Sequence, residues 1–425
     1  MKHGLIQKRL ISALAVMILL LAILLPTLAS CDKGGILNGD TTTLYVYNWG
    51  EYISDGSEDT VDVNEEFERW YFDTYGERVK VNYSTYSSNE SMYAKISSGS
   101  TNYDVIVPSD YMIQRMIDEG LLAKLNYENI PNAESILPEF ENADYDPDGD
   151  GDGYNDYSVP YMYGMIGIIY NTTMVDEADI GSWDLMWNEK YTGNILQFNN
   201  SRDAFGSAQY FLGLDVNSDN EAEWRQALDK LREQKPILQG YVMDEIYNKM
   251  ESGSAAIAAY YAGDFMAMYE NNEDLDFFYP KEGTNLYVDA MCIPAASQNQ
   301  LIAERYINFM LSVDEDYGAP AIANAEYTYY ASPSAWVRND EDYIAYMNDI
   351  KDGGFDLMYD TSAIPTTSYE NLSPEGLLRL SGLWEELKSD VSVSGMIYAL
   401  CAVILAVLIA GGSFLAIRKR WRDRY

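Results

Sequence analysis

Three aspartates that alternate with glycines near the middle of the chain have a spacing that suits a calcium ion. Asp148, Asp150 and Asp152 form a D-x-D-x-D-G pattern, and Asp156 stands where a ninth-position ligand falls. Alternate carboxylates can converge on one cation because glycine permits a sharp turn. The twelfth position is Val159 rather than glutamate, so a complete EF-hand is absent. The pattern therefore leaves two interpretations open, a structural calcium site and a solvated acidic loop.

The chain lacks the side chains that most hydrolytic mechanisms require. His3 is its single histidine, and the three cysteines are Cys31, Cys292 and Cys401. Because His3 lies within the expected signal peptide, Ser-His-Asp triads, histidine-based zinc sites and Cys-His pairs are excluded. We expect a protein that is not an enzyme, has no cofactor apart from the possible calcium, and has no disulfide within its fold.

Acidic residues dominate the central part of the chain. When residues 1–31 and 396–425 are set aside, 66 of the 67 acidic residues remain, but only 20 of the 28 basic ones. Such a charge repels nucleic acid and attracts cations. High negative charge is also a common source of solubility, so by itself it is weak evidence for a cationic ligand.

The N-terminus has the features of an export signal. Lys2, Lys8 and Arg9 precede an apolar run over residues 10–25, which is short for a membrane span but typical of a signal peptide. Leu28-Ala29-Ser30-Cys31 resembles the bacterial lipobox, in which the cysteine is lipidated. The alternative is an uncleaved anchor helix with an incidental cysteine. Both place the following residues outside the cytoplasm, with residues 32–43 as a tether.

The C-terminus predicts a second attachment to the membrane. Residues 396–417 contain no charged side chain and are long enough to cross a bilayer as a helix. Arg418, Lys419 and Arg420 follow at once, and the positive-inside rule places such a cluster in the cytoplasm. We therefore expect a transmembrane helix over 396–417 and a cytoplasmic basic tail over 418–425.

Between the two ends, expected strands alternate with expected helices. The strands are predicted at residues 44–47, 78–83, 103–107, 165–170, 194–198, 255–260, 275–279 and 287–293. The helices are predicted at residues 61–75, 89–98, 111–119, 182–189, 202–212, 221–232, 244–251, 299–311 and 374–388. This alternation indicates an α/β fold with a parallel sheet and ligands at the carboxyl ends of the strands.

Several segments, taken in order, resemble the spermidine/putrescine-binding proteins of ABC importers. They are LYVYNWGEY (44–52), YSTYSSNESMYAK (83–95), YDVIVPSDY (103–111), YSVPY (157–161), YPKEG (279–283) and VDAMCIP (288–294). The resemblance covers roughly residues 42–388. It implies the type II periplasmic-binding-protein clamshell, with lobe 1 made of residues 44–158 and 289–328 and lobe 2 of residues 159–288 and 329–389, joined by a crossover hinge.

The resemblance also implies which residues line the binding cleft. These are Trp49, Tyr52, Ser109, Asp110, Tyr111, Asn200, Asp203, Tyr260, Tyr287, Asp289 and Tyr330. A polyamine carries ammonium groups separated by methylenes. Carboxylates, aromatic faces and neutral hydrogen-bond acceptors are the groups that bind such a molecule.

Four of these positions also have a structural interpretation. Asp110 adds a carboxylate to the cleft or caps the following helix. Asn200 and Asp203 align with a carboxylate pair of the family, but both could simply start a helix. Asp289 matches the family's carboxylate for an amine and interrupts an apolar strand, although a buried structural aspartate is the alternative.

The preferred function is the capture of polyamines outside the cell for an ABC importer, whose permease and ATPase are separate chains. Tyr260 and Tyr287 align with tryptophans of well-known members, which leaves the choice between spermidine and putrescine open. The alternatives are a binding protein of the same fold for another small solute, and a calcium-dependent surface or sensory protein. An anionic ligand would need arginine, and Arg202 is the strongest candidate in the cleft.

Overall fold

The computed structural model describes residues 41–389, and these form a mixed α/β fold around one continuous sheet. The order of the strands along the sheet is β2-β1-β3-β9-β4-β7-β5-β6, and β8 and β10 pair with β4 and β9 at its sides. The signal peptide, the lipid site and the transmembrane helix are predicted in residues 1–40 and 390–425, which lie outside the described residues. Within residues 41–389, no helix is both long enough and apolar enough to cross a membrane.

The ten strands have these bounds: β1 Thr42–Trp49, β2 Val79–Tyr86, β3 Val105–Ile106, β4 Ser158–Asn171, β5 Ile195–Phe198, β6 Leu238–Val242, β7 Ile257–Tyr261, β8 Leu275–Phe278, β9 Thr284–Cys292 and β10 Thr366–Thr367. The α-helices have these bounds: α2 Val63–Tyr75, α3 Asn89–Ser97, α4 Asp110–Asp118, α5 Ser201–Leu212, α6 Glu221–Gln234, α7 Ile246–Glu251, α8 Ala262–Asn271, α9 Gln300–Met310, α10 Pro320–Thr328, α11 Ala335–Arg338, α12 Glu341–Ile350, α13 Gly354–Tyr359 and α14 Pro374–Ser389.

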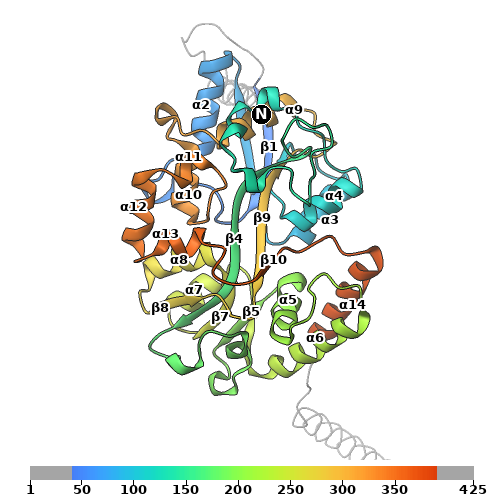
Figure 1. The fold of residues 1–425 in the computed structure, drawn as a ribbon. Helices are drawn as coiled ribbons and strands as arrows, with labels where there is room; N and C mark the ends of the chain where they lie inside the picture. The colour runs from blue at the N-terminus through green and yellow to red at the C-terminus, as the bar shows by residue number, and fades with distance from the viewer. Residues whose placement is uncertain (1–40, 390–425) are drawn as a thin grey trace, which may run out of the picture. The chain divides into compact units, whose positions relative to one another are not determined.

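The sheet consists of two strand groups that two long strands connect. The first strand group is β1, β2 and β3, and the second is β5, β6, β7 and β8. Figure 1 shows β4 and β9 running side by side from one group to the other. The first part of β4 pairs with β9, and its last residues pair with β7 and β8. Every residue of β4 is buried, because β4 passes through the centre of the fold.

The expected parallel pairing is found within the strand groups. β1 pairs in parallel with β2 and β3, and β5 pairs in parallel with β6 and β7. The connecting strand β4 pairs with β7, β8 and β9 in antiparallel fashion, and β9 also pairs with β3 in antiparallel fashion but with β10 in parallel, so the sheet is mixed. The expected lobes join at 158–159, 288–289 and 328–329, which fall at the start of β4, inside β9 and at the end of α10.

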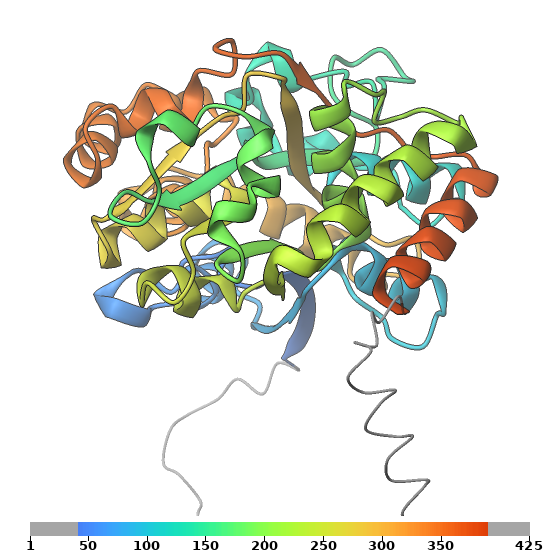
Figure 2. The same ribbon diagram turned by 90° about the horizontal axis from the view of Figure 1, so that it is seen from below.

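Helices cover both strand groups. The apolar faces of α5, α6 and α14 form one cluster around Phe205, Trp224 and Leu383, and Figure 2 shows α14 lying beside α6. The α2 helix begins at Asp62, whose side chain accepts a hydrogen bond from Glu65 N, and it ends at Gly76 in the left-handed conformation.

One expected helix, at residues 182–189, is wrong. The segment forms two 3-10 turns, Trp183–Trp187 and Glu189–Tyr191. The side chain of Asn188 accepts a hydrogen bond from Lys190 N and so starts the second turn where an α-helix would continue. The expected strand at 165–170 is only the end of the much longer β4.

Candidate functional site

A cavity between the two strand groups lies at the carboxyl ends of their parallel strands. Trp49 ends β1, Ser109 follows β3, Asn200 follows β5, and Tyr261 ends β7. Ligands of open α/β sheets commonly lie at this edge, because the connecting loops and helix N-termini converge there. All eleven residues expected in the cleft line this cavity, namely Trp49, Tyr52, Ser109, Asp110, Tyr111, Asn200, Asp203, Tyr260, Tyr287, Asp289 and Tyr330.

Asp289 is held by hydroxyl groups of the first half of the chain. Ser109 Oγ donates to Asp289 Oδ1 at 2.6 Å, and Tyr52 Oη donates to Asp289 Oδ2 at 2.8 Å. Asn89 Nδ2 in turn donates to Ser109 Oγ at 3.0 Å. Burial raises the pKa of Asp289 to about 6, although the hydrogen bonds from Ser109 and Tyr52 oppose the rise. These hydrogen bonds fix the carboxylate in the cavity wall.

Asp203 and Asn200 lie at the start of helix α5 and also line the cavity. Asn200 caps α5 by accepting a hydrogen bond from Asp203 N at 2.8 Å, as the helix-start interpretation expects. Its Nδ2 also donates to Asp203 Oδ2 at 2.6 Å, and Tyr261 Oη donates to the same oxygen at 2.7 Å. Burial raises the pKa of Asp203 above its ordinary value. The helix start therefore presents a carboxylate to the cavity.

Asp110 bridges helix α4 and strand β9. Its Oδ1 accepts from Tyr111 N at 2.7 Å and its Oδ2 accepts from Val288 N at 3.3 Å. Val288 directly precedes Asp289, so Asp110 fixes the backbone that carries the central carboxylate. Asp110 is 1% exposed, and burial raises its pKa to about 8. The position at the N-cap of α4 belongs to Ser109, so Asp110 is not the cap of this helix.

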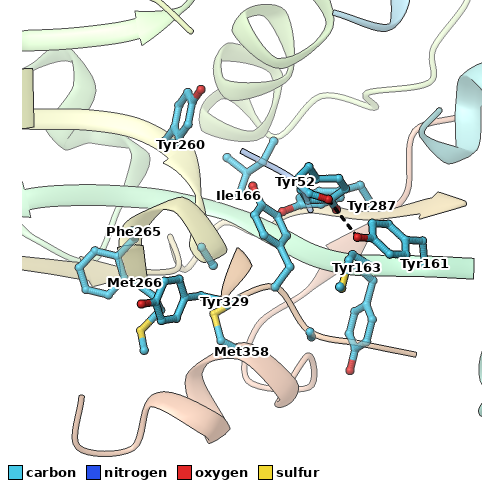
Figure 3. Packing of buried hydrophobic residues seen from close by; sticks show 14 of the residues in the cluster. Tyr52, Tyr161, Tyr163, Ile166, Tyr260, Phe265, Met266, Tyr287, Tyr329 and Met358 are labelled. Carbon is cyan, nitrogen blue, oxygen red and sulfur yellow. Dashed lines mark hydrogen bonds between the residues drawn. The ribbon is translucent and has the colours of Figure 1, made fainter. Parts of the chain in front are cut away.

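Aromatic rings form most of the remaining wall. Trp49 Nε1 donates to Val107 O at 2.9 Å, which fixes the indole beside Tyr86. Tyr52 and Tyr330 contact each other edge to face with ring centroids 4.9 Å apart. Figure 3 shows Tyr52 beside Tyr287, with the hydroxyl of Tyr161 bonded to the Tyr52 carbonyl at 2.9 Å. Tyrosine faces can hold methylenes and cations alike.

Tyr260 packs in the core, whereas the neighbouring Tyr261 contacts the acidic wall of the cavity. Tyr260 is 2% exposed and stacks on Phe198 at a centroid distance of 5.5 Å. Tyr261 contacts the Tyr287 ring at 5.4 Å and bonds to Asp203. The sequence comparison selected Tyr260 and missed Tyr261, because the expected strand ended one residue before β7 does.

Asp264 is a carboxylate in the cavity wall that the sequence analysis missed. Tyr247 Oη donates to Asp264 Oδ1 at 2.5 Å, and Tyr330 Oη donates to Asp264 Oδ2 at 2.7 Å. Burial raises its pKa to about 6. Asp264 stands in the first turn of α8, directly after β7, so the rule that ligands lie at strand ends could have found it.

Other lining residues that the sequence analysis did not select are mostly acidic or aromatic. The acidic and aromatic ones are Glu51, Tyr86, Glu90, Asp244, Tyr247, Tyr261, Asp264 and Tyr369, and the rest are Gly50, Ser87, Ser88, Asn89, Met243 and Asn285. Together with the predicted residues, the part of the lining that residues 41–389 supply holds seven carboxylates, nine tyrosines and one tryptophan, and no lysine, arginine or histidine. A cavity of this kind attracts a cation that has apolar segments.

Arg202 does not reach into this cavity. Its Nη1 donates to Val216 O at 2.7 Å and its Nη2 donates to Asn217 Oδ1 at 2.7 Å. The guanidinium lies over the Tyr369 ring, 4.2 Å from the centroid, and Arg202 is not one of the residues that line the cavity. The arginine that an anionic ligand would need is therefore committed to the protein's own carbonyl and amide oxygens.

The aspartate–glycine loop brings three of its four expected ligands together. Carboxylate oxygens of Asp148, Asp150 and Asp156 lie within 4.8 Å of one another. Asp152 instead accepts a hydrogen bond from Tyr154 N at 3.0 Å, and Lys124 Nζ contacts Asp156 Oδ2 at 2.5 Å. The arrangement is compatible with a cation and also with an acidic loop that pairs with lysine, so calcium binding stays a prediction.

Comparison with known proteins identifies relatives over most of the described residues. The family described as bacterial extracellular solute-binding protein matches residues 65–319. The spermidine/putrescine-binding periplasmic protein of Escherichia coli (strain K12) is 32% identical over 276 residues, which are 65% of this chain and 74% of that protein. A putrescine-binding periplasmic protein of the same organism is 29% identical over 299 residues, 66% of this chain and 76% of that one.

Solved structures show the same similarity. A putative spermidine/putrescine ABC transporter protein from Listeria monocytogenes is 33% identical, with a TM-score of 0.71 over 82% of this chain and 99% of that chain. The spermidine/putrescine substrate-binding protein of Streptococcus pneumoniae, solved with calcium and HEPES, is 34% identical, with a TM-score of 0.63 over 82% and 98%. The α/β periplasmic-binding-protein fold expected from the sequence is therefore confirmed.

Proposed function

The chain belongs to the bacterial extracellular solute-binding proteins, and we propose that it captures polyamines such as spermidine and putrescine for uptake by an ABC transporter. The permease and the ATPase would be separate chains. Members of this family are solute-binding proteins that act outside the cytoplasm. Of the two Escherichia coli relatives, one is named for binding spermidine and putrescine and the other for binding putrescine.

The observation that carries the proposal is the charge and composition of the cavity. Among the described residues, seven carboxylates and ten aromatic rings line it, and no basic side chain does. Asp203, Asp289 and Asp264 are each held by a tyrosine hydroxyl, which leaves further carboxylate lone pairs for ammonium groups. Burying a carboxylate is costly unless a cation compensates it, so a polycation is the ligand that would lower the cost of this cavity.

Isothermal titration of the protein with a panel of solutes tests the proposal. We expect one spermidine or putrescine to bind per chain, with no heat from glutamate or another anion. Asp264→Asn should weaken binding of the polyamine that binds the wild type most tightly, because this variant removes one charge from the cavity wall. Heat from an amino acid, an opine-like compound or a metal chelate, with silence from every di- and triamine, would instead favour the same fold with another solute.

The finer arrangement at the membrane is also a proposal. Two lobes, residues 44–158 with 289–328 and residues 159–288 with 329–389, would close on the ligand about β4 and β9. The support for an anchor comes from the sequence alone, in the lipobox before Cys31 and the uncharged residues 396–417 followed by a basic tail. Either attachment would keep the receptor near its transporter.

A further inference from the structure

Two cavity tyrosines pack against glycines so closely that no side chain fits there. The hydroxyl of Tyr369 lies 2.0 Å from the position that a Cβ atom would take at Gly206. Ring carbon Cδ2 of Tyr330 lies 2.3 Å from the same position at Gly263. Cβ atoms of real proteins essentially never approach other heavy atoms within 3.0 Å, so any larger residue at these glycines must displace a ring.

A third pair repeats the arrangement on the connecting strand. The hydroxyl of Tyr287, in β9, lies 2.6 Å from the Cβ position of Gly164 in β4. These two residues are directly opposite in the antiparallel pairing of β4 and β9. Three tyrosines that line the same cavity are thus each packed against a glycine.

The backbone does not explain why glycine stands at these positions. The glycines with positive φ are other residues of the described chain, and Gly164, Gly206 and Gly263 are not among them. Gly206 lies in the interior of α5 and Gly263 in the first turn of α8, where helix propensity favours alanine over glycine. The space that the tyrosines occupy is what excludes a side chain.

A ring displaced from its glycine would move into the cavity. Tyr369 is 4% and Tyr330 5% exposed, and their other neighbours are close-packed. The Arg202 guanidinium covers one face of Tyr369, and the edge of the Tyr330 ring meets Tyr52. Both rings line the cavity, so the cavity is the space into which they can move. A shift of Tyr330 would also break its hydrogen bond to Asp264.

We propose that Gly164, Gly206 and Gly263 are positioning residues of the binding site, and that they set its width by letting Tyr287, Tyr369 and Tyr330 lie back against the backbone. A cavity walled by aromatic rings and carboxylates suits an unbranched chain of methylenes and ammonium groups. The effect on ligand binding rests on the polyamine function proposed above, whereas the packing of the tyrosines does not depend on it.

Thermal unfolding of the ligand-free full chain in detergent tests the packing. Gly206→Ala should lower the melting temperature by about 2–6 °C, the range for overpacking a core. Adding Tyr369→Phe should restore most of the loss, because the hydroxyl is the only atom of Tyr369 closer than 3.0 Å to the Cβ position. Tyr330→Phe should not rescue Gly263→Ala, because there the ring carbons Cδ2, Cε2 and Cγ lie at 2.3–2.7 Å.

Gly382→Ala is the matched control. Gly382 also lies in a helix, α14, and no atom lies within 4 Å of its Cβ position, so this variant should melt at or above the wild-type temperature. Additive effects of Gly206→Ala and Tyr369→Phe would overturn the proposed packing. Equal rescue by Tyr→Phe at both sites would overturn it as well.

Titration with spermidine and putrescine tests the effect on the cavity. Gly206→Ala and Gly263→Ala should weaken binding about tenfold or more, and Gly382→Ala should bind as the wild type does. Wild-type affinity in both cavity variants would overturn the role in setting the width. If the wild-type protein binds no amine, the polyamine function fails, and the melting experiment still decides whether the glycines position the tyrosines.

Discussion

The hydroxyl of Tyr52 donates a hydrogen bond of 2.8 Å to Asp289 Oδ2, although 237 positions separate the two residues in the chain. Tyr52 follows β1 of the first strand group, and Asp289 lies within β9, which connects both groups. The bond therefore ties the central carboxylate of the cavity to the N-terminal part of the fold. Ser109 makes the same connection from the end of β3.

Asp289→Asn should weaken polyamine binding by about 2–5 kcal/mol, because it removes one partner of a buried charge pair. Isothermal titration of the variant measures the loss. Asp229→Asn is the control, since this carboxylate is 72% exposed on α6 and outside the cavity. Equal affinity of Asp289→Asn and the wild type would show that Asp289 does not contact the ligand.

Polyamine affinity should rise with pH between about 5 and 7. Burial raises the pKa of Asp289 and that of Asp264 to about 6, so both carboxyls carry protons below this pH and must lose them to pair with ammonium groups. For each of the two carboxyls, the affinity should fall about tenfold for every pH unit below the pKa of that carboxyl. Asp264→Asn should reduce the slope of affinity against pH, and an unchanged slope would exclude Asp264 from the titration.

Asp110 should make the ligand-free protein less stable as the pH rises. Burial raises its pKa to about 8 in the folded protein, against about 4 in the unfolded chain. Its contribution to the free energy of unfolding is fully present below about pH 4 and is lost as the pH rises through about 8. In Asp110→Asn, the melting temperature should fall less between pH 5 and 8 than it does in the wild type. If the variant and the wild type lose the same number of degrees over this range, Asp110 is not the group that titrates.

Calcium should raise the melting temperature through the loop that contains Asp148, Asp150 and Asp156, because a ligand that binds only the folded state stabilises it. Scanning calorimetry in millimolar calcium and in EDTA checks this. Asp150→Asn should abolish the difference, whereas Asp144→Asn, an exposed acid outside the trio, should keep it. Identical melting curves for the wild type in the two buffers would identify a solvated acidic loop.

Two attachments should hold the protein at the membrane. Truncation after Asp390 or Cys31→Ala alone should leave it in the membrane fraction, and the combination should release it. A tag after Tyr425 should resist protease added to intact cells, because the basic tail is expected in the cytoplasm. Cleavage of the tag in intact cells, or release by Cys31→Ala alone, would contradict the predicted transmembrane helix.

The sequence by itself determined the class of fold and the chemistry of the site. Alternating strands and helices predicted an α/β sheet, since the periods of 2 and 3.6 residues can be read locally. The excess of acids and the lack of a second histidine limited the ligand and the chemistry. Residues directly after predicted strands, such as Trp49 and Ser109, could be placed near the site because parallel strands end at one edge of a sheet.

Only the tertiary structure decided which acids face one another across the cavity. Asp264 lines it, whereas Arg202, the candidate for an anionic ligand, binds carbonyl and amide oxygens of the protein and is not part of the lining. Asp110 holds the backbone at Val288, a contact across 178 positions that no local pattern shows. These contacts depend on how β4 and β9 join the two strand groups, and spacing along the chain carries no information about atoms that meet only when the sheet is complete.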